Sequence, residues 1–260
     1  MKKNFKYLFV ISFFVLLAVV FGAYGSDAET KSDNQDVVMT DVDGSKLPRG
    51  VKYKAFVHYP AKGKPPIIRP SCTETNTSSS HFEPVGWALK GSKFYNINRA
   101  TVPTHLLSYI DEVMENSWQA WRKADSMAYV AKGDDTSVSR ANYDGTNLVA
   151  WGRVPNGAIA VTYTWYYSGT GEQLESDLIF SNKLKWSYTP YTGDNDCAGI
   201  SGTYDVQDIA THELGHWVGL DDLYGDADKD LTMYGYGFTA ELKKATLGDG
   251  DVLGAAAIIP

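Results

Sequence analysis

The sequence predicts an α+β domain, because segments with the patterns of strands and of helices both occur along the chain. Residues 158–167 are a run of β-branched, aromatic and small apolar residues, which is typical of a strand. Residues 106–121 instead place apolar side chains three or four positions apart, as a helix does. The chain has 260 residues, 43% of them apolar and 24 of them glycine, so it can bury a core between many turns.

Four segments have the pattern of strands. Val51, Tyr53, Ala55 and Val57 alternate with polar residues, so the first strand is expected at about 52–59. The other three are expected at 94–98, 158–167 and 177–180.

Three segments have the pattern of helices. The first opens at Pro103 and turns one apolar face inward. The second begins near Asp205, where Asp205 and Asp208 are suited to cap it. The third lies within 240–258, with these residues expected to face inward: Leu242, Leu247, Val252 and Ala256.

The N-terminal residues 1–25 have the pattern of a signal peptide, with lysines followed by an uncharged apolar run and small residues at its end. The alternative is an uncleaved membrane anchor. Residues 26–83 are interpreted as an N-terminal extension or short pro-segment, because they are polar and then rich in proline, serine and threonine. The folded domain is expected at 84–260, outside the cytoplasm.

Charge and cysteine content narrow the possible partners. The chain has 24 Lys and Arg against 31 Asp and Glu, a net charge of −7, which argues against nucleic acid or an anionic membrane as a partner. Cys72 and Cys197 are the two cysteines, and in an exported chain we expect them to form a disulfide. Two free buried thiols are the alternative.

The segment that carries chemistry is His212-Glu213-Leu214-Gly215-His216. On a helix, His212 and His216 lie one turn apart on the same face, where two neutral imidazoles can bind one tetrahedral cation. Glu213 lies beside the first imidazole and can take a proton from a water molecule there. The pattern predicts metal-assisted hydrolysis, although the same spacing also occurs where histidines only pack or cap.

The residues that follow resemble the metzincin metallopeptidases, whose motif continues through a glycine to a further His or Asp. Gly219 follows His216 by three positions, and a glycine there ends a helix and reverses the chain. The resemblance makes Asp222 the third zinc ligand, with Asp221 as the neighbouring competitor. It also makes Met233 the methionine of the turn beneath the metal.

The resemblance is closest to the matrixin-like branch and covers residues 84–260. It implies a metzincin-like catalytic domain: a twisted mixed sheet with an antiparallel edge strand, two long helices and a small C-terminal subdomain. It also implies one catalytic Zn²⁺, and a polypeptide substrate extended along the edge strand, for which residues 158–167 are the candidate. A monomer is expected.

The chain departs from that branch at several positions. Asp222 stands where most matrixins have His, and the remaining histidines all precede residue 126, so a second, structural zinc is not supported. The cysteine-switch motif of their pro-segments is missing. Calcium is a second candidate metal at Asp226, Asp228 and Asp230, for which a solvated acidic turn is the simpler interpretation.

The function expected from the sequence is therefore that of a secreted zinc endopeptidase with Glu213 as the catalytic base. One alternative is a zinc peptidase of another class with Glu241 as third ligand. The other is an extracellular surface or binding protein that keeps zinc without proteolytic activity. An intact Glu213 argues against the non-catalytic alternative, since a structural zinc site needs no base.

Overall fold

The computed structural model describes residues 40–61, 79–124, 129–190 and 199–258. Within them lie three α-helices, nine strands and four short 3₁₀ helices. The helices are α1 (Ile110–Ala124), α2 (Val206–Val218) and α3 (Asp249–Ile258). The strands are β1 (Val51–Pro60), β2 (Ser92–Ile97), β3 (Tyr129–Lys132), β4 (Asn147–Gly152), β5 (Ala160–Tyr167), β6 (Glu172–Ser181), β7 (Trp186–Ser187), β8 (Tyr204–Asp205) and β9 (Tyr236–Gly237).

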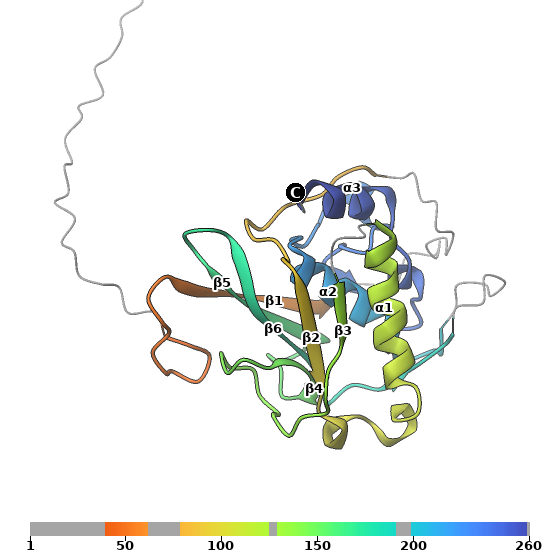
Figure 1. Ribbon diagram of the computed structural model, residues 1–260. Coiled ribbons are helices and arrows are strands. Elements are labelled where there is room, and N and C mark those ends of the chain that lie inside the picture. Colours follow the sequence, from red (N-terminus) through yellow and green to blue (C-terminus); the bar gives the residue numbers. More distant parts are fainter. Residues whose placement is uncertain (1–39, 62–78, 125–128, 191–198, 259–260) are drawn as a thin grey trace, which may run out of the picture. The chain divides into compact units, whose positions relative to one another are not determined.

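Seven strands form one mixed sheet in the order β3-β2-β4-β6-β5-β1-β9 (Figure 1). The β2, β3, β4 and β6 pairs are parallel, whereas β5 is antiparallel to β6. Strand β1 is antiparallel to β5 along its length, and its end pairs in parallel with β9. The α+β class and the mixed sheet agree with the expectation from the sequence.

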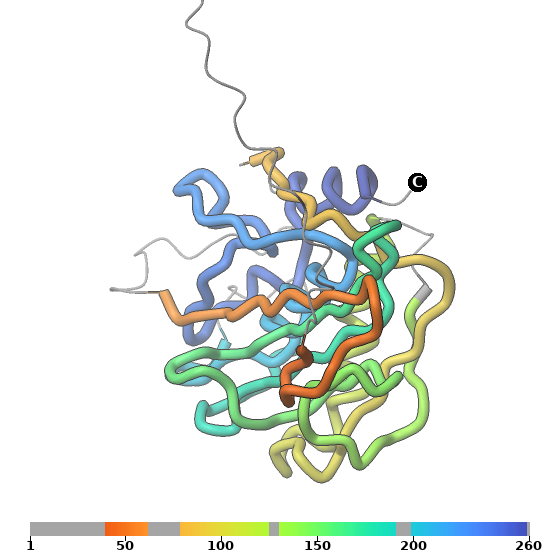
Figure 2. Tube along the Cα trace, turned by 90° about the vertical axis from the view of Figure 1, so that its left-hand side faces the viewer, coloured from red at the N-terminus to blue at the C-terminus, as the bar shows by residue number. Residues whose placement is uncertain are grey.

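The position of β5 in the sheet differs from the expectation. The segment 158–167 was expected to be an exposed edge, but in the structure β5 lies between β6 and β1. Figure 2 shows the orange trace of β1 running beside the green trace of β5. The covering strand comes from the segment expected to be an extension, and sequence periodicity does not reveal which strand pairs with which.

Helices α1 and α2 lie side by side against one face of the sheet (Figure 1). Trp118 of α1 and Trp217 of α2 meet edge to face with ring centroids 5.7 Å apart, and both are fully buried. Acidic residues begin α1 and basic residues end it, which complements the helix dipole. The packing of Trp118 against Trp217 fixes the position of α2, the helix that carries the histidine motif.

A second apolar cluster covers the opposite face of the sheet. Its buried residues are Leu47, Val51, Ala141, Leu148, Ala150, Trp165 and Ile179. The chain before β1 and the loop before β4 therefore close this side, so the central strands β4, β5 and β6 are mostly buried on both faces.

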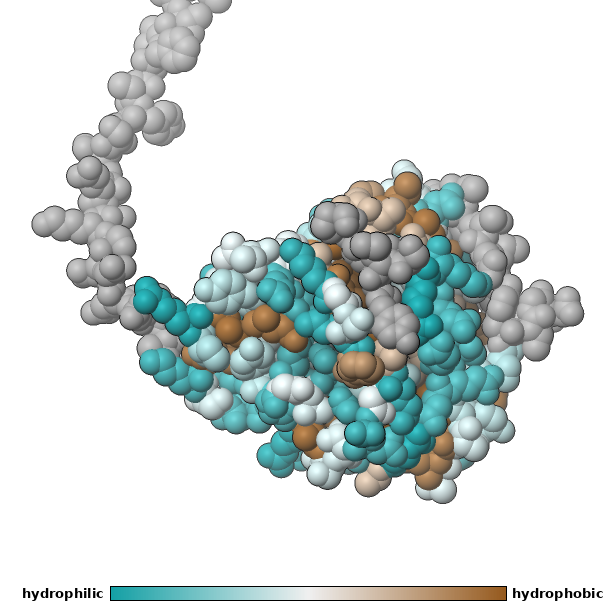
Figure 3. Space-filling model, in the orientation of Figure 1, coloured by the Kyte–Doolittle hydropathy of each residue, from teal (hydrophilic) through white to brown (hydrophobic). Residues whose placement is uncertain are grey.

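The C-terminal part contains a shorter helix than expected. A 3₁₀ turn, Lys243–Ala245, precedes α3, which begins at Asp249. Leu242 and Leu247 are buried as expected, but the prediction was wrong for Val252 and Ala256, which are exposed. Leu242 and Leu247 lie before the helix and so do not mark its inward face, which is formed by Gly250, Asp251, Gly254 and Ala255. The face shown in Figure 3 is mostly hydrophilic, with hydrophobic residues in several separate places, one of them around α3. No helix among the described residues is long and apolar enough to cross a membrane.

Candidate metal centre

Helix α2 holds the motif between two well-defined ends. The Asp205 carboxylate caps the first turn by accepting from the N–H groups of Gln207 and Asp208 at 3.0 and 3.2 Å. Gly219 ends the helix with φ 125°, a conformation that L side chains rarely adopt, and a Cβ there would collide with the carbonyl oxygen of Trp87. The reversal at Gly219 directs the following residues back toward the helix.

His212 and His216 are oriented by backbone carbonyls. Nδ1–H of His212 donates to the carbonyl of Thr232 at 2.7 Å, and Nδ1–H of His216 donates to that of Leu220 at 2.8 Å. A carbonyl only accepts, so the hydrogen of each neutral ring lies on Nδ1 and the lone pair on Nε2. Burial, aided by the neighbouring His212, lowers the pKa of His216 to about 4.

Asp222 completes a group that we call the metal triad: His212, His216 and Asp222. Its Oδ1 lies 3.2 Å from Nε2 of His212 and 3.7 Å from Nε2 of His216. One ligand atom from each of the three residues lies within 4.8 Å of the others, close enough to hold one metal ion. Burial alone would raise the pKa of Asp222, but the positive charge that His216 and His212 carry when protonated lowers it to about 2.

Several buried polar atoms at this place have no hydrogen-bond partner. They include Nε2 of His212, Oδ1 of Asp222 and Oε1 of Glu213. Buried polar atoms are nearly always paired in folded proteins, so unpaired atoms that converge indicate a missing ligand. Two imidazole nitrogens and a carboxylate oxygen are the donor set that zinc accepts. The residues present therefore fit a zinc ion.

Glu213 is held beside the triad rather than within it. Its Oε2 accepts from the hydroxyl of Thr162 on β5 at 2.6 Å, which leaves Oε1 as the unpaired oxygen. The side chain is fully buried, and burial raises the pKa of Glu213 well above its usual value. A carboxyl group in this position can exchange a proton with a molecule beside the triad.

Asp221 points to a different partner. Its Oδ2 forms an ion pair with Nζ of Lys54 on β1, and Asp221 is not one of the residues that form the triad. The two neighbouring aspartates are thus separated by the turn after Gly219, one toward the histidines and one toward β1.

Met233 lies beneath α2. A side chain at Gly215 would collide with the Met233 sulfur, so the glycine permits this close approach. Asp251 fixes the turn by accepting from the N–H groups of Thr232 at 2.7 Å and Met233 at 3.0 Å. The fully buried ammonium of Lys244 donates to the carbonyls of Thr232 and Tyr234 on either side of the methionine.

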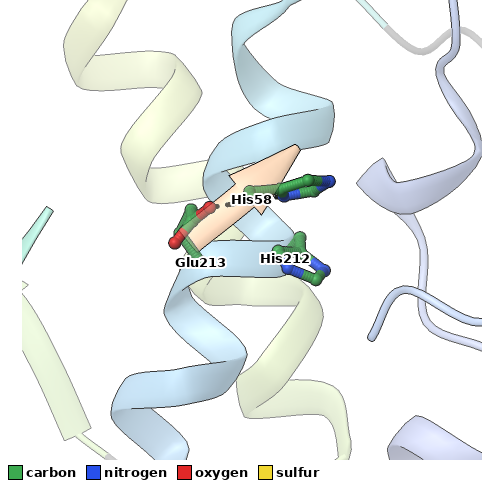
Figure 4. Close-up of side chains that lie close together, drawn as sticks. All are labelled: His58, His212 and Glu213. Carbon is green, nitrogen blue, oxygen red and sulfur yellow. Dashed lines mark ion pairs between the residues drawn. The ribbon is translucent and has the colours of Figure 1, made fainter. Parts of the chain in front are cut away.

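The structure also brings His58 of β1 to the centre, which the sequence did not suggest. His58, His212 and Glu213 form a second group of potential ligands, and Figure 4 shows the His58 ring beside His212. Nδ1 of His58 lies 3.3 Å from Oε1 of Glu213, and the His58 side chain is fully buried. Burial lowers the pKa of His58 well below its usual value, so the ring is neutral. A lone histidine in a strand pattern carries no sequence signal for this role.

Other predicted site residues lie elsewhere. Asp226 pairs with Lys229, and Asp228 bonds to His81 and Ser79, so these carboxylates are engaged by protein groups. Glu241 is buried and accepts from the N–H of Phe238, and it belongs to neither group of potential ligands in the described residues. Cys72, Cys197 and the signal segment lie outside the described residues, so the disulfide and the export signal stay predictions.

Comparison with known proteins found no family model that matches this chain and no curated protein that matches it. What stands is a buried His-His-Asp cluster based on a helix of a mixed-sheet α+β fold, able to hold a metal ion.

Proposed function

We propose that this protein is a secreted zinc-dependent endopeptidase. The observation that carries the proposal is the position of Glu213. Its unpaired Oε1 lies beside the triad without being part of it, where a structural metal site would need no additional carboxylate. The metzincin resemblance of the motif, of Gly219 and of Met233 supports the same reaction class.

The metal triad would hold the ion through Nε2 of His212, Nε2 of His216 and a carboxylate oxygen of Asp222. A zinc ion bound there supplies a Lewis acid for the scissile carbonyl and makes a nearby water more acidic. Thr232 and Leu220 keep the two lone pairs directed at the ion by accepting the Nδ1 hydrogens.

Glu213 moves the proton in this scheme. Oε1 accepts a proton from the attacking water and later delivers it to the nitrogen of the departing amine. Thr162 holds the other oxygen, so the carboxyl group keeps one orientation during both transfers. The substrate class is an extended polypeptide, for which β5, the strand whose Thr162 bonds to Glu213, would offer main-chain partners on the side that β1 occupies in this structure.

The test compares hydrolysis and metal content in the full chain and in His58→Ala, which removes the imidazole lying against Glu213. We expect one zinc per chain, and casein cleavage that a chelator abolishes and added zinc restores in at least one of the two proteins. Zinc binding without cleavage in either protein would favour the alternative, a zinc-binding extracellular protein without proteolytic activity.

A further inference from the structure

Three alternate residues of β1 contact the candidate metal centre. Side chains two apart on a strand share a face, so Lys54, Phe56 and His58 point the same way. Lys54 forms the ion pair with Asp221, and the Phe56 ring stacks on His216 with centroids 3.9 Å apart and planes 9° apart. His58 completes the series, with its ring centroid 4.0 Å from that of His212.

The main chain of β1 occupies the free side of β5. Their antiparallel pairing runs from Val51 opposite Tyr167 to His58 opposite Ala160. The His58 carbonyl accepts from the N–H of Ile159 at 2.7 Å, and beyond the strand the N–H of Ala61 donates to the Gly237 carbonyl at 3.0 Å. The other side of β5 is paired with β6, so an added peptide strand would need the groups that β1 already uses.

His58 itself is an unsatisfied buried residue. Neither ring nitrogen makes a hydrogen bond of good geometry, although the side chain is fully buried; Nδ1 lies 3.3 Å from Oε1 of Glu213, and the backbone of Tyr236 is the other polar neighbour. Such an arrangement is costly unless the nitrogens have another partner. The two groups of potential ligands share His212, and a ring nitrogen of His58 lies within 4.8 Å of a ring nitrogen of His212.

We propose that His58 is a fourth ligand of the metal, and that β1 is a built-in occupant of the strand position where an extended peptide would bind. The inference rests on the proposed function. Three protein ligands leave one position of a tetrahedral zinc open for chemistry, whereas four close it. The chain with β1 docked is then a latent form, and displacing β1 frees both the β5 side and the fourth position.

The test counts imidazole ligands by X-ray absorption spectroscopy on the zinc-loaded full chain and its variants. Three imidazoles are expected in the wild type and two in His58→Ala. His81→Ala is the matched control, because His81 is half exposed and bonds to Asp228 and Glu83 instead. His58→Gln keeps more of the buried volume and is expected to give the same count as His58→Ala.

Two further readouts accompany the count. Competition with a chelator should show zinc bound about 10- to 100-fold more weakly by His58→Ala and unchanged by His81→Ala. Hydrolysis of an unstructured peptide should rise by about tenfold or more in His58→Ala, since the open form is no longer suppressed.

Two imidazoles in both the wild type and His58→Ala, with zinc still bound, would overturn the inference and leave the proposed function standing. A full chain that binds no zinc would overturn both. Three imidazoles in the wild type and two in His58→Ala, with a rise in hydrolysis, support the inference.

Discussion

Two regions of this molecule bury acidic side chains, and they differ in whether the carboxyl oxygens have hydrogen-bond partners within the chain. The paired carboxylates, Asp41 before β1 and Glu175 and Asp177 on β6, have both oxygens engaged by N–H groups of the chain. Asp177 accepts from Asn142 and Leu148 at 3.1 and 2.8 Å, and Glu175 accepts from Asp144 and Gly145 at 3.0 and 2.7 Å. Asp41 accepts from the backbone of Tyr143 and the indole of Trp165.

His212, Asp222 and Glu213 instead keep buried atoms that have no hydrogen-bond partner, namely Nε2, Oδ1 and Oε1, and Asp222 and Glu213 each lie in a group of potential ligands with His212. A buried carboxyl group is therefore not by itself what distinguishes a metal site in this protein. The distinguishing feature is a set of buried nitrogen and oxygen atoms that the fold leaves without hydrogen-bond partners. The paired carboxylates should accordingly govern stability, and the triad should govern metal binding.

The largest effect is expected at Glu213. Glu213→Ala should lower peptide hydrolysis by about 100- to 10,000-fold, because the proton acceptor is lost, while zinc content stays at one per chain. Hydrolysis is measured beside metal content, in the wild-type background and in His58→Ala. Cleavage at an undiminished rate would show that Glu213 is not the base.

The next effect separates the two neighbouring aspartates. Asp222→Ala should weaken zinc binding by at least about 100-fold, since it removes a ligand of the triad, whereas Asp221→Ala should bind zinc nearly normally. Metal content after dialysis against a mild chelator measures the difference. Retained zinc in Asp222→Ala together with loss in Asp221→Ala would reverse the assignment.

The paired carboxylates should respond in the opposite way. Asp177→Ala leaves two buried N–H groups without an acceptor, so the free energy of unfolding should fall by about 2–4 kcal/mol while zinc affinity is unchanged. Urea unfolding of the metal-free proteins, with Asp222→Ala as the partner variant, makes the comparison. A larger loss of metal-free stability in Asp222→Ala would remove the distinction between the regions.

A smaller effect concerns pH. Burial raises the pKa of Glu175 from 4.5 to about 7, although the N–H groups of Asp144 and Gly145 act in the opposite sense. The folded state thus favours the neutral form, so this contribution to stability is full below about pH 4.5 and is lost as pH rises through about 7.

Glu175→Gln should make the fall in stability between these pH values shallower, by on the order of 1–3 kcal/mol. Unfolding is followed with a chelator present, so that metal binding does not contribute. Identical pH profiles for the wild type and Glu175→Gln would contradict the assignment.

The sequence predicted the local part of the site. His212, Glu213 and His216 follow from helical spacing, and the placement of Asp222 follows from the reversal that Gly219 permits one turn later. These relations are set within a short stretch of chain, where residue spacing fixes geometry. The α+β class was predictable for the same reason, since strand and helix periodicities are local.

The non-local part was not predictable. His58 reaches the centre only because β1 pairs with β5, and Lys244 and Asp251 reach the Met233 turn only through the packing of the C-terminal segment. Alternation indicated that residues 52–59 form a strand, but it contains no information about its partner. Segment 158–167 was correctly predicted as a strand and wrongly as an edge for this reason.

The central claim is that the unpaired atoms of the metal triad are a zinc site. Calorimetric titration of zinc into the chelator-stripped full chain tests it most directly, with the His212→Ala/His216→Ala double variant alongside. The account predicts one tight site per chain in the wild type and its loss in the double variant. No tight binding by the wild type, or equal binding by both proteins, would contradict it.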